Sequence, residues 1–262
     1  MKTFKLITGF FFLTMISACV DMEENILVNE DNSGVYSVSI DLGKMMKMIS
    51  QMGEGKTDEI KGLDKKDSII YLKDLVLACD SLTSAEKELY QDGFIRIKSD
   101  DVNEQMKIMM TCPFKKISQL PEIKGNFLKT LDKLKAFEKI SGKQKDPGMP
   151  EDNGEMASNL LSPGSDDNYK FTAEPGKITN TIMNIEDYKK EILSDSAMIS
   201  MQQLSTLLGE MTYKTTITTP REIKKYSGNN AELSGNKKII VFKNTLTEMI
   251  EHPEKLAYQV EY

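Results

Sequence analysis

The sequence predicts an α+β fold, with helices packed on one face of an antiparallel sheet. Pairs of short runs rich in β-branched and aromatic residues are separated by polar turns, a pattern typical of β-hairpins. Other stretches repeat apolar residues at i, i+3, i+4 and i+7, which is typical of amphipathic helices. Hairpins, helices and strands recur on both sides of a segment rich in Gly, Pro, Ser and Asp. Strands and helices grouped in this way indicate the α+β class.

The first part of the predicted fold covers residues 26–140. It opens with a hairpin in which a polar turn joins the strand-like runs 26–28 and 35–40. Thr83 and Glu86 form a capping-box pattern that begins a short helix. The remaining predictions are strands at 94–98 and 105–111, and helices at 42–52, 69–79 and 123–140.

The second part covers residues 169–262 and follows a segment, 141–168, that we expect to be a flexible linker. Pro220 should end a long strand, because proline cannot donate a hydrogen bond to a sheet. Strands are predicted at 169–173, 177–183, 211–219, 231–233, 238–242 and 256–262, and helices at 185–192, 197–208 and 245–251. The pattern leaves open whether the two parts share one sheet.

The first nineteen residues predict where the protein is located. A short basic start precedes an uncharged, largely apolar run that is too short to span a bilayer. The run ends in Ile16-Ser17-Ala18-Cys19, which resembles the lipobox of bacterial lipoproteins. The resemblance implies a signal peptide at 1–18, cleavage between Ala18 and Cys19, diacylglycerol on the Cys19 thiol and an acyl chain on the new amine. Two or more acyl chains anchor a protein stably in a membrane.

The residues that follow bear on the position within the cell envelope. Residues 19–25 are expected to form a lipidated tether, and their acidic composition resembles the surface-export signals of Bacteroidota lipoproteins. The resemblance implies an outer-membrane protein exposed at the cell surface, although a plain solvated linker explains the same residues. The membrane, reached through the lipid on Cys19, is the first predicted partner.

Composition excludes one class of partner. The chain carries a formal net charge of −6, and only Arg96 and Arg221 among its 34 basic residues are arginines. An acidic chain with so few guanidinium groups is poorly suited to binding phosphates through paired hydrogen bonds. We therefore expect no nucleic-acid partner.

Cys79 and Cys112 are the cysteines that remain once Cys19 is lipidated. An exported, oxidising compartment allows a disulfide between them. Each also ends an apolar run, which is typical of a buried thiol in a core. Both interpretations stay open.

Several short motifs resemble catalytic or metal sites, but each lacks a required residue. Ser84 and Lys87 match a Ser-x-x-Lys pattern without its companion motifs, and a helix start explains them. Residues 53–57 lack the first glycine of a phosphate-binding loop, and the turn at 29–34 lacks the bidentate glutamate of a calcium loop. His252 is the only histidine, so a zinc site or a histidine-based triad has no support. We predict no catalytic residue, no metal site and no cofactor.

The chain contains 17 methionines, several of which gather at 45–52, 106–110 and 198–201. Flexible, polarisable side chains on one helix face can adapt to varied hydrophobic ligands. Core packing explains the same residues, since Met45 and Met52 share a predicted helix face with Ile49.

Features near both ends of the chain resemble a known family. Residues 24–36 form a strand, a turn and a strand directly after the lipidated cysteine. Residues 213–220 form a strand and its stop, and a polar turn at 234–238 leads to a strand and to a helix that starts near Thr245. This order resembles the LppM-like family of bacterial lipoproteins. The resemblance implies a non-enzymatic envelope protein that contacts lipids.

The sequence therefore favours a lipid-anchored envelope protein with a non-catalytic binding or structural role. Its partner would be a hydrophobic ligand or another envelope protein, held in a groove between helices and sheet. The alternative is an envelope hydrolase or transferase whose Asp/Glu pair is assembled only in the folded chain. Such carboxylates lie about 5 to 9 Å apart in glycosidases, so a measured distance separates the two hypotheses.

Overall fold

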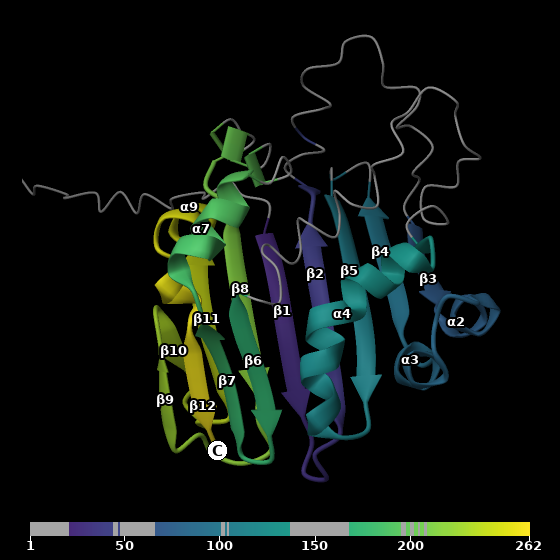
Figure 1. Ribbon diagram of the computed structural model, residues 1–262, viewed down its shortest axis with the longest axis horizontal. Coiled ribbons are helices and arrows are strands. Elements are labelled where there is room, and N and C mark those ends of the chain that lie inside the picture. The colour runs from purple at the N-terminus through teal and green to yellow at the C-terminus, as the bar shows by residue number, and fades with distance from the viewer. Residues whose placement is uncertain are drawn as a thin grey trace, which may run out of the picture.

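The computed structural model describes residues 21–43, 47, 66–100, 103, 105–136, 168–194, 198–199, 202–203, 205–206 and 209–262. In this part of the chain, the larger of two sheets has the strand order β10-β11-β8-β1-β2-β5-β4-β3 (Figure 1). Its strands are β1 (Asp21–Val28), β2 (Gly34–Asp41), β3 (Lys66–Tyr71), β4 (Phe94–Asp100), β5 (Gln105–Phe114), β8 (Thr212–Thr218), β10 (Ala231–Leu233) and β11 (Ile239–Thr245).

The smaller sheet has four strands in the order β6-β7-β12-β9. These strands are β6 (Tyr169–Glu174), β7 (Lys177–Ile182), β9 (Lys225–Gly228) and β12 (Tyr258–Glu261). The described α-helices are α2 (Lys73–Ala78), α3 (Ser84–Tyr90), α4 (Leu120–Lys133), α7 (Ile185–Ser194) and α9 (Leu246–Glu251), with 3₁₀ turns η1 (Ile117–Gln119) and η2 (Pro253–Leu256).

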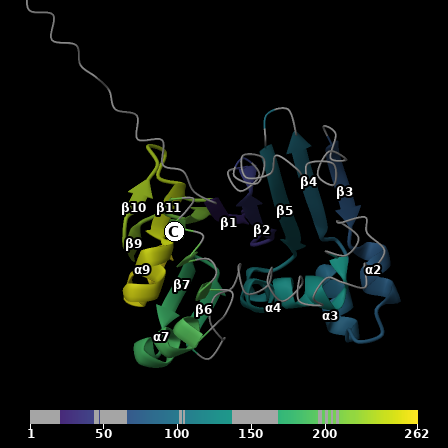
Figure 2. The same ribbon diagram turned by 90° about the horizontal axis from the view of Figure 1, so that it is seen from above.

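Helix α4 and the small sheet cover the same face of the large sheet. Figure 2 shows them side by side below the large sheet, and α4 contacts β2 and β5. Helix α4 also contacts β6, an edge strand of the small sheet. The small sheet is held to the large one by Phe242 of β11 and Tyr258 of β12, whose rings stack at 4.8 Å between centroids. The predicted α+β class with antiparallel sheets is confirmed. The sequence did not predict that a second, smaller sheet covers part of the large one.

Beneath α4 the fold has an apolar core. Ile123, Phe127 and Leu131 recur at four-residue spacing on α4, and all three are fully buried. The Phe127 ring stacks on Tyr90 at 6.0 Å between centroids and meets the edge of Tyr36 at 6.3 Å. The helical stripe predicted from the sequence therefore packs directly on the large sheet.

The turn between β1 and β2 shows why its residues are polar. Asp31 Oδ1 accepts hydrogen bonds from the Ser33 N–H at 3.0 Å and from its hydroxyl at 2.6 Å. Asn32 adopts a left-handed φ of 64°. A Cβ at Gly34 would lie 2.0 Å from the carbonyl oxygen of Leu27, so only glycine fits there. These residues form the predicted hairpin turn.

The two parts of the chain share the large sheet. Strand β8, from the second part, pairs in parallel with β1, from the first, so that Asp21 lies opposite Thr212 and Leu27 opposite Thr218. The other strand pairs of both sheets are antiparallel in the described residues. Parallel neighbours require a long crossover connection, which a hairpin pattern in the sequence does not reveal.

Two local predictions differ from the structure, and one strand was not predicted. Residues 21–25, predicted as tether, are paired strand, because β1 begins at Asp21. Residues 66–71 form the edge strand β3, so the predicted helix begins only at Lys73, since pairing with β4 overrides the helical spacing. Strand β9 was not predicted, because all four of its residues are exposed and show no alternation. Most other predicted strands and helices that fall on described residues are confirmed within a few positions.

Some predictions lie largely or wholly outside the described residues. These are the signal peptide at 1–18 with its cleavage at Ala18 and Cys19, most of the helix at 42–52, the linker at 141–168 apart from Asn168, and most of the helix at 197–208. Among the described helices, none has the length and apolar character needed to cross a membrane.

Candidate functional site

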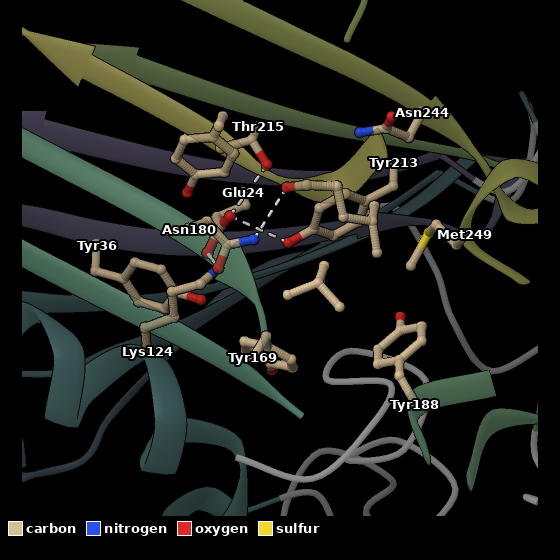
Figure 3. Close-up of a pocket in the computed structure, with 13 residues that line it drawn as sticks. Glu24, Tyr36, Lys124, Tyr169, Asn180, Tyr188, Tyr213, Thr215, Asn244 and Met249 are labelled. Carbon is tan, nitrogen blue, oxygen red and sulfur yellow. Dashed lines mark hydrogen bonds and ion pairs between the residues drawn. The ribbon is translucent and has the colours of Figure 1, made fainter. Parts of the chain in front are cut away.

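A cavity of about 60 Å³ lies between the two sheets, beside α4 (Figure 3). Ten of the thirteen residues that line the cavity carry a polar group, and Ile182, Met249 and Leu256 are apolar; the ten are Glu24, Tyr36, Lys124, Tyr169, Asn180, Tyr188, Tyr213, Thr215, Asn244 and Tyr258. A water molecule needs about 10–15 Å³ of cavity volume measured in this way, so the cavity of about 60 Å³ has room for about four to six water-sized groups.

Glu24 is at the centre of the polar lining and is completely buried. Its carboxylate accepts hydrogen bonds from the ammonium group of Lys124, from the Thr215 hydroxyl at 3.1 Å and from the Tyr213 hydroxyl at 3.1 Å. Burial by itself raises the pKa of this carboxyl group. The charge of Lys124 and the hydrogen bonds outweigh burial, so the pKa of Glu24 lies below its ordinary value. Glu24 is therefore ionised, and its carboxylate is held by hydrogen bonds from Lys124, Tyr213 and Thr215.

Strand register and helix position bring these groups together. Glu24 is on the covered face of β1, and Thr215 lies directly opposite it on the parallel strand β8. Figure 3 shows Lys124 reaching from α4 towards Glu24. The ammonium group of Lys124 also lies 5.2 Å from the ring centroid of Phe171 on β6. The partners of Glu24 thus come from β8, which carries Thr215 and Tyr213, and from α4, which carries Lys124.

Four tyrosines of the lining, Tyr36, Tyr188, Tyr213 and Tyr258, are neutral. Burial, reinforced by the charge of Glu24, raises the pKa values of Tyr36, Tyr213 and Tyr258 well above the ordinary value. Burial also raises the pKa of Tyr188. Their hydroxyl groups can therefore donate and accept hydrogen bonds, but they do not act as phenolates.

Four buried polar atoms of the lining have no hydrogen-bond partner among the described residues: Asn180 Oδ1, Tyr188 Oη, Asn244 Oδ1 and Tyr258 Oη. The residues Tyr188, Asn244 and Tyr258 are only 1%, 6% and 7% exposed. An unpaired buried polar group costs about 1–3 kcal/mol. Folded proteins pair most such groups, so four at one cavity indicate that a bound molecule or water completes them.

The lining of the cavity contains no pair of carboxylates. Glu24 is the only carboxylate in its lining, and its partners keep it ionised. The hypothesis of an Asp/Glu pair therefore finds no support at this cavity. Within the described residues, no group of three His, Cys, Asp or Glu side chains could hold a metal ion.

A second hollow, of about 230 Å³, lies beside the start of β1. Its lysines are paired within the fold, since Lys214 binds Glu23 and Lys243 binds Glu232 at 2.8 Å. This hollow therefore offers a ligand fewer unpaired groups than the cavity between the sheets.

The cysteines predicted from the sequence are not part of the cavity. Ala18 and Cys19 lie outside the described residues. Cys79 and Cys112 are free thiols, which favours the interpretation without a disulfide. Burial raises the pKa of Cys112 to about 12, whereas Cys79 is half-buried and lies 3.2 Å from the Ser81 hydroxyl.

The short motifs have structural roles. Glu86 N–H donates to the Thr83 hydroxyl at 3.2 Å, and Thr83 N–H donates to the Glu86 carboxylate at 2.7 Å, which is the predicted capping box before Ser84. His252 is exposed, caps the end of α9 and lies 3.3 Å from Glu254. Ser84 and His252 are thus explained by helix ends.

Neither of the two hollows described above is lined by a cluster of methionines. Met110 and Met198 are buried in the core, and Met249 is the one methionine of the cavity lining. Met45 and Met52 lie outside the described residues, so their role stays a prediction.

Sequence reasoning missed the cavity because its polar residues are single positions scattered over many elements. One signal was present. Glu24 alternates with Met22 and Ile26, so it occupies a covered-face position of a strand where an apolar residue is expected.

Comparisons with known proteins add one weak likeness in fold. No family model and no curated protein matches the chain. Among solved structures, the NMR structure of the folded domain of the Mycobacterium tuberculosis LppM protein is similar, with a TM-score of 0.36 and 7% sequence identity. The alignment covers 94% of this chain and 91% of that one. A likeness at this level supports no statement about the cavity.

Proposed function

We propose that this chain is a non-catalytic binding protein of the bacterial cell envelope, anchored by lipid on Cys19, that holds a small polar molecule between its two sheets. The observation that carries the proposal is the group of four unpaired polar atoms at one cavity. A ligand that completes their hydrogen bonds offsets the free energy lost by burying them.

The polar lining changes the ligand expected from the sequence. A hydrophobic molecule in this cavity would leave the same four atoms unpaired and would also face the ion pair of Glu24 and Lys124. A polar ligand is therefore the better match. A hydrophobic ligand of the predicted helix at 42–52 stays a prediction, because most of that segment lies outside the described residues.

The proposed anchor is close to the fold. Cys19 ends the lipobox-like run, and β1 begins only two positions later, at Asp21. The acidic residues that predicted surface export are used by the fold, since Glu23 binds Lys214 and Glu24 is buried. Their presence is thus explained without an export signal, and the outer-membrane and cell-surface location stays a prediction from the sequence.

The anchor is tested by Cys19→Ser. The variant should not be lipidated and should move from the detergent phase to the aqueous phase in Triton X-114 partitioning, because the acyl chains supply the membrane affinity. Cys79→Ser is the matched control and should partition like the wild type. Unchanged partitioning of Cys19→Ser would show that the protein is not anchored in this way.

Binding is tested by filling the cavity. Ile182 lines it, so Ile182→Phe should reduce the space available to a ligand. We expect native mass spectrometry of protein purified from the envelope to show a small-molecule adduct on the wild type and to lose it in Ile182→Phe. Ile69→Phe, the same change on the exposed edge strand β3, should keep the adduct. Absence of any adduct on the wild type would contradict the binding function.

A further inference from the structure

We infer that the ligand of the cavity is a neutral molecule with several hydroxyl groups, of about the size of glycerol, or the hydroxylated tip of a larger molecule. This inference rests on the proposed binding function and names the ligand class. It follows from three properties of the lining: its charge, its pattern of donors and acceptors, and its volume.

The charge of the lining is already balanced. Glu24 and Lys124 carry opposite charges, contact each other and are the only charged side chains of the lining. Lys124 is held between Glu24 and the Phe171 ring, and Glu24 is held by three donors. A charged ligand would therefore be buried without a free counter-charge, which is unfavourable. The neutral tyrosines do not change this balance.

The unpaired atoms specify hydrogen-bonding groups. Asn180 Nδ2 donates to the Leu256 carbonyl at 3.0 Å, so the unpaired atom of Asn180 is its oxygen, which only accepts. Asn244 Oδ1 likewise only accepts. The ligand must therefore donate at two positions, while the Tyr188 and Tyr258 hydroxyls can each donate or accept. Hydroxyl is a neutral group that meets all these demands at once.

The volume limits the size of the group that enters. Room for about four to six water-sized groups fits a three-carbon polyol but not a large ring system. Figure 3 shows Tyr188 and Asn180 on different sides of the space, so a ligand that pairs with both needs hydrogen-bonding groups at more than one of its positions. A polyol thus matches charge, hydrogen-bonding pattern and size.

The test is an NMR titration of the mature chain from residue 19, carrying Cys19→Ser, with four probes of similar size. Glycerol is neutral and hydroxylated, serinol replaces one hydroxyl by an ammonium group, glycerate carries a carboxylate, and 1-butanol is mainly apolar. We expect saturable shifts with glycerol and a dissociation constant of about 1 mM, as suits so small a ligand. Serinol, glycerate and 1-butanol should bind at least about tenfold more weakly.

Two conservative variants localise the binding. Tyr188→Phe removes one unpaired hydroxyl and keeps the ring, so it should weaken glycerol binding about fivefold or more without lowering the melting temperature. Tyr262→Phe removes a buried, unpaired hydroxyl that does not line the cavity, and it should leave the titration unchanged.

Each other outcome overturns the inference. Equal binding of serinol or glycerate would show that the ligand class is charged, and preferred binding of 1-butanol would show that it is apolar. No response to any probe, or equal responses in Tyr188→Phe and the parent chain, would show that the cavity holds water only or another ligand class. An envelope-derived adduct that Ile182→Phe removes would still support the proposed function in these cases.

Discussion

The covered face of the large sheet is divided into two regions of opposite character. Beneath α4, the contacts are apolar, with Phe127 stacked on Tyr90. Beneath the small sheet, the same face presents Glu24 and Thr215 and encloses a cavity. A helix with an apolar stripe fills the space above a sheet, whereas two sheets that face each other with polar residues leave part of it open. Because a polar interior of this kind stabilises a fold less than apolar packing, its presence favours a role in binding.

The largest expected loss of stability comes from replacing Lys124, which reaches from α4 into the polar region. Replacing it by methionine leaves the buried Glu24 without its counter-charge, so Lys124→Met should lower the free energy of unfolding by about 3–5 kcal/mol. Lys133→Met is the matched control on the same helix, because its ion pair with Glu86 at 3.6 Å is in contact with solvent and contributes little to stability. Urea unfolding of the Cys19→Ser chain measures both. Equal losses would mean that the polar region is solvated like a surface.

A double variant sharpens that result. Glu24→Gln should recover much of the stability lost in Lys124→Met, since it removes the uncompensated charge and keeps the shape of the side chain. If the losses of the two single variants simply add, Glu24 and Lys124 are not coupled as the structure indicates.

The next effect belongs to the apolar region. Leu131 is fully buried on α4, so Leu131→Ala should cost about 2–5 kcal/mol through lost contacts and a new void. Binding of glycerol should be unchanged at temperatures where the variant is folded, because Leu131 does not line the cavity. Calorimetry and the NMR titration measure the two properties. A loss of binding without a loss of stability would show that the regions are not separate.

A smaller effect is expected from pH. The pKa of Glu24 is lowered in the folded chain, so its ionised form contributes stability that is present above its unfolded value, near 4.5. This contribution is lost as the pH falls below 4.5 and through the lower folded pKa. When the pH is lowered from neutral to below 4.5, the melting temperature of Glu24→Gln should therefore fall less than that of the parent chain. Parallel pH profiles would contradict the assignment of Glu24 as an ionised residue.

The smallest expected losses of stability come from removing helix caps, and they should be equal in the two parts of the chain. Thr83 and Thr245 each form a capping box, one at the start of α3 and one at the start of α9. Thr83→Ala and Thr245→Ala should each cost about 1 kcal/mol, because each leaves one helix N–H without its side-chain acceptor. Urea unfolding measures both losses. A larger loss in one variant would show that its cap has a second structural role, for example in holding residues of the cavity lining in place.

The sequence predicted most local elements and little of the site. Apolar spacing on α4 and the capping residue Thr83 are local signals, and both were interpreted correctly. The cavity depends on Glu24, Lys124 and Thr215, which meet only because β1 and β8 pair in parallel and α4 crosses the sheet. Such pairings between distant segments leave no periodic pattern. Edge strands β3 and β9 were missed for a related reason, since their partners and not their own residues decide their structure.

The parallel pairing of β1 with β8 also dictates the order in which the chain can be completed. Partners such as Asp21 and Thr212 are 191 residues apart, so the edge of β1 has no neighbour on that side until most of the chain has been synthesised. Contacts of such long sequence separation form slowly. An open strand edge can meanwhile pair with other chains. Folding of this protein therefore includes an interval in which its first strand has an open edge, and a chain cut short before β8 would keep that edge exposed.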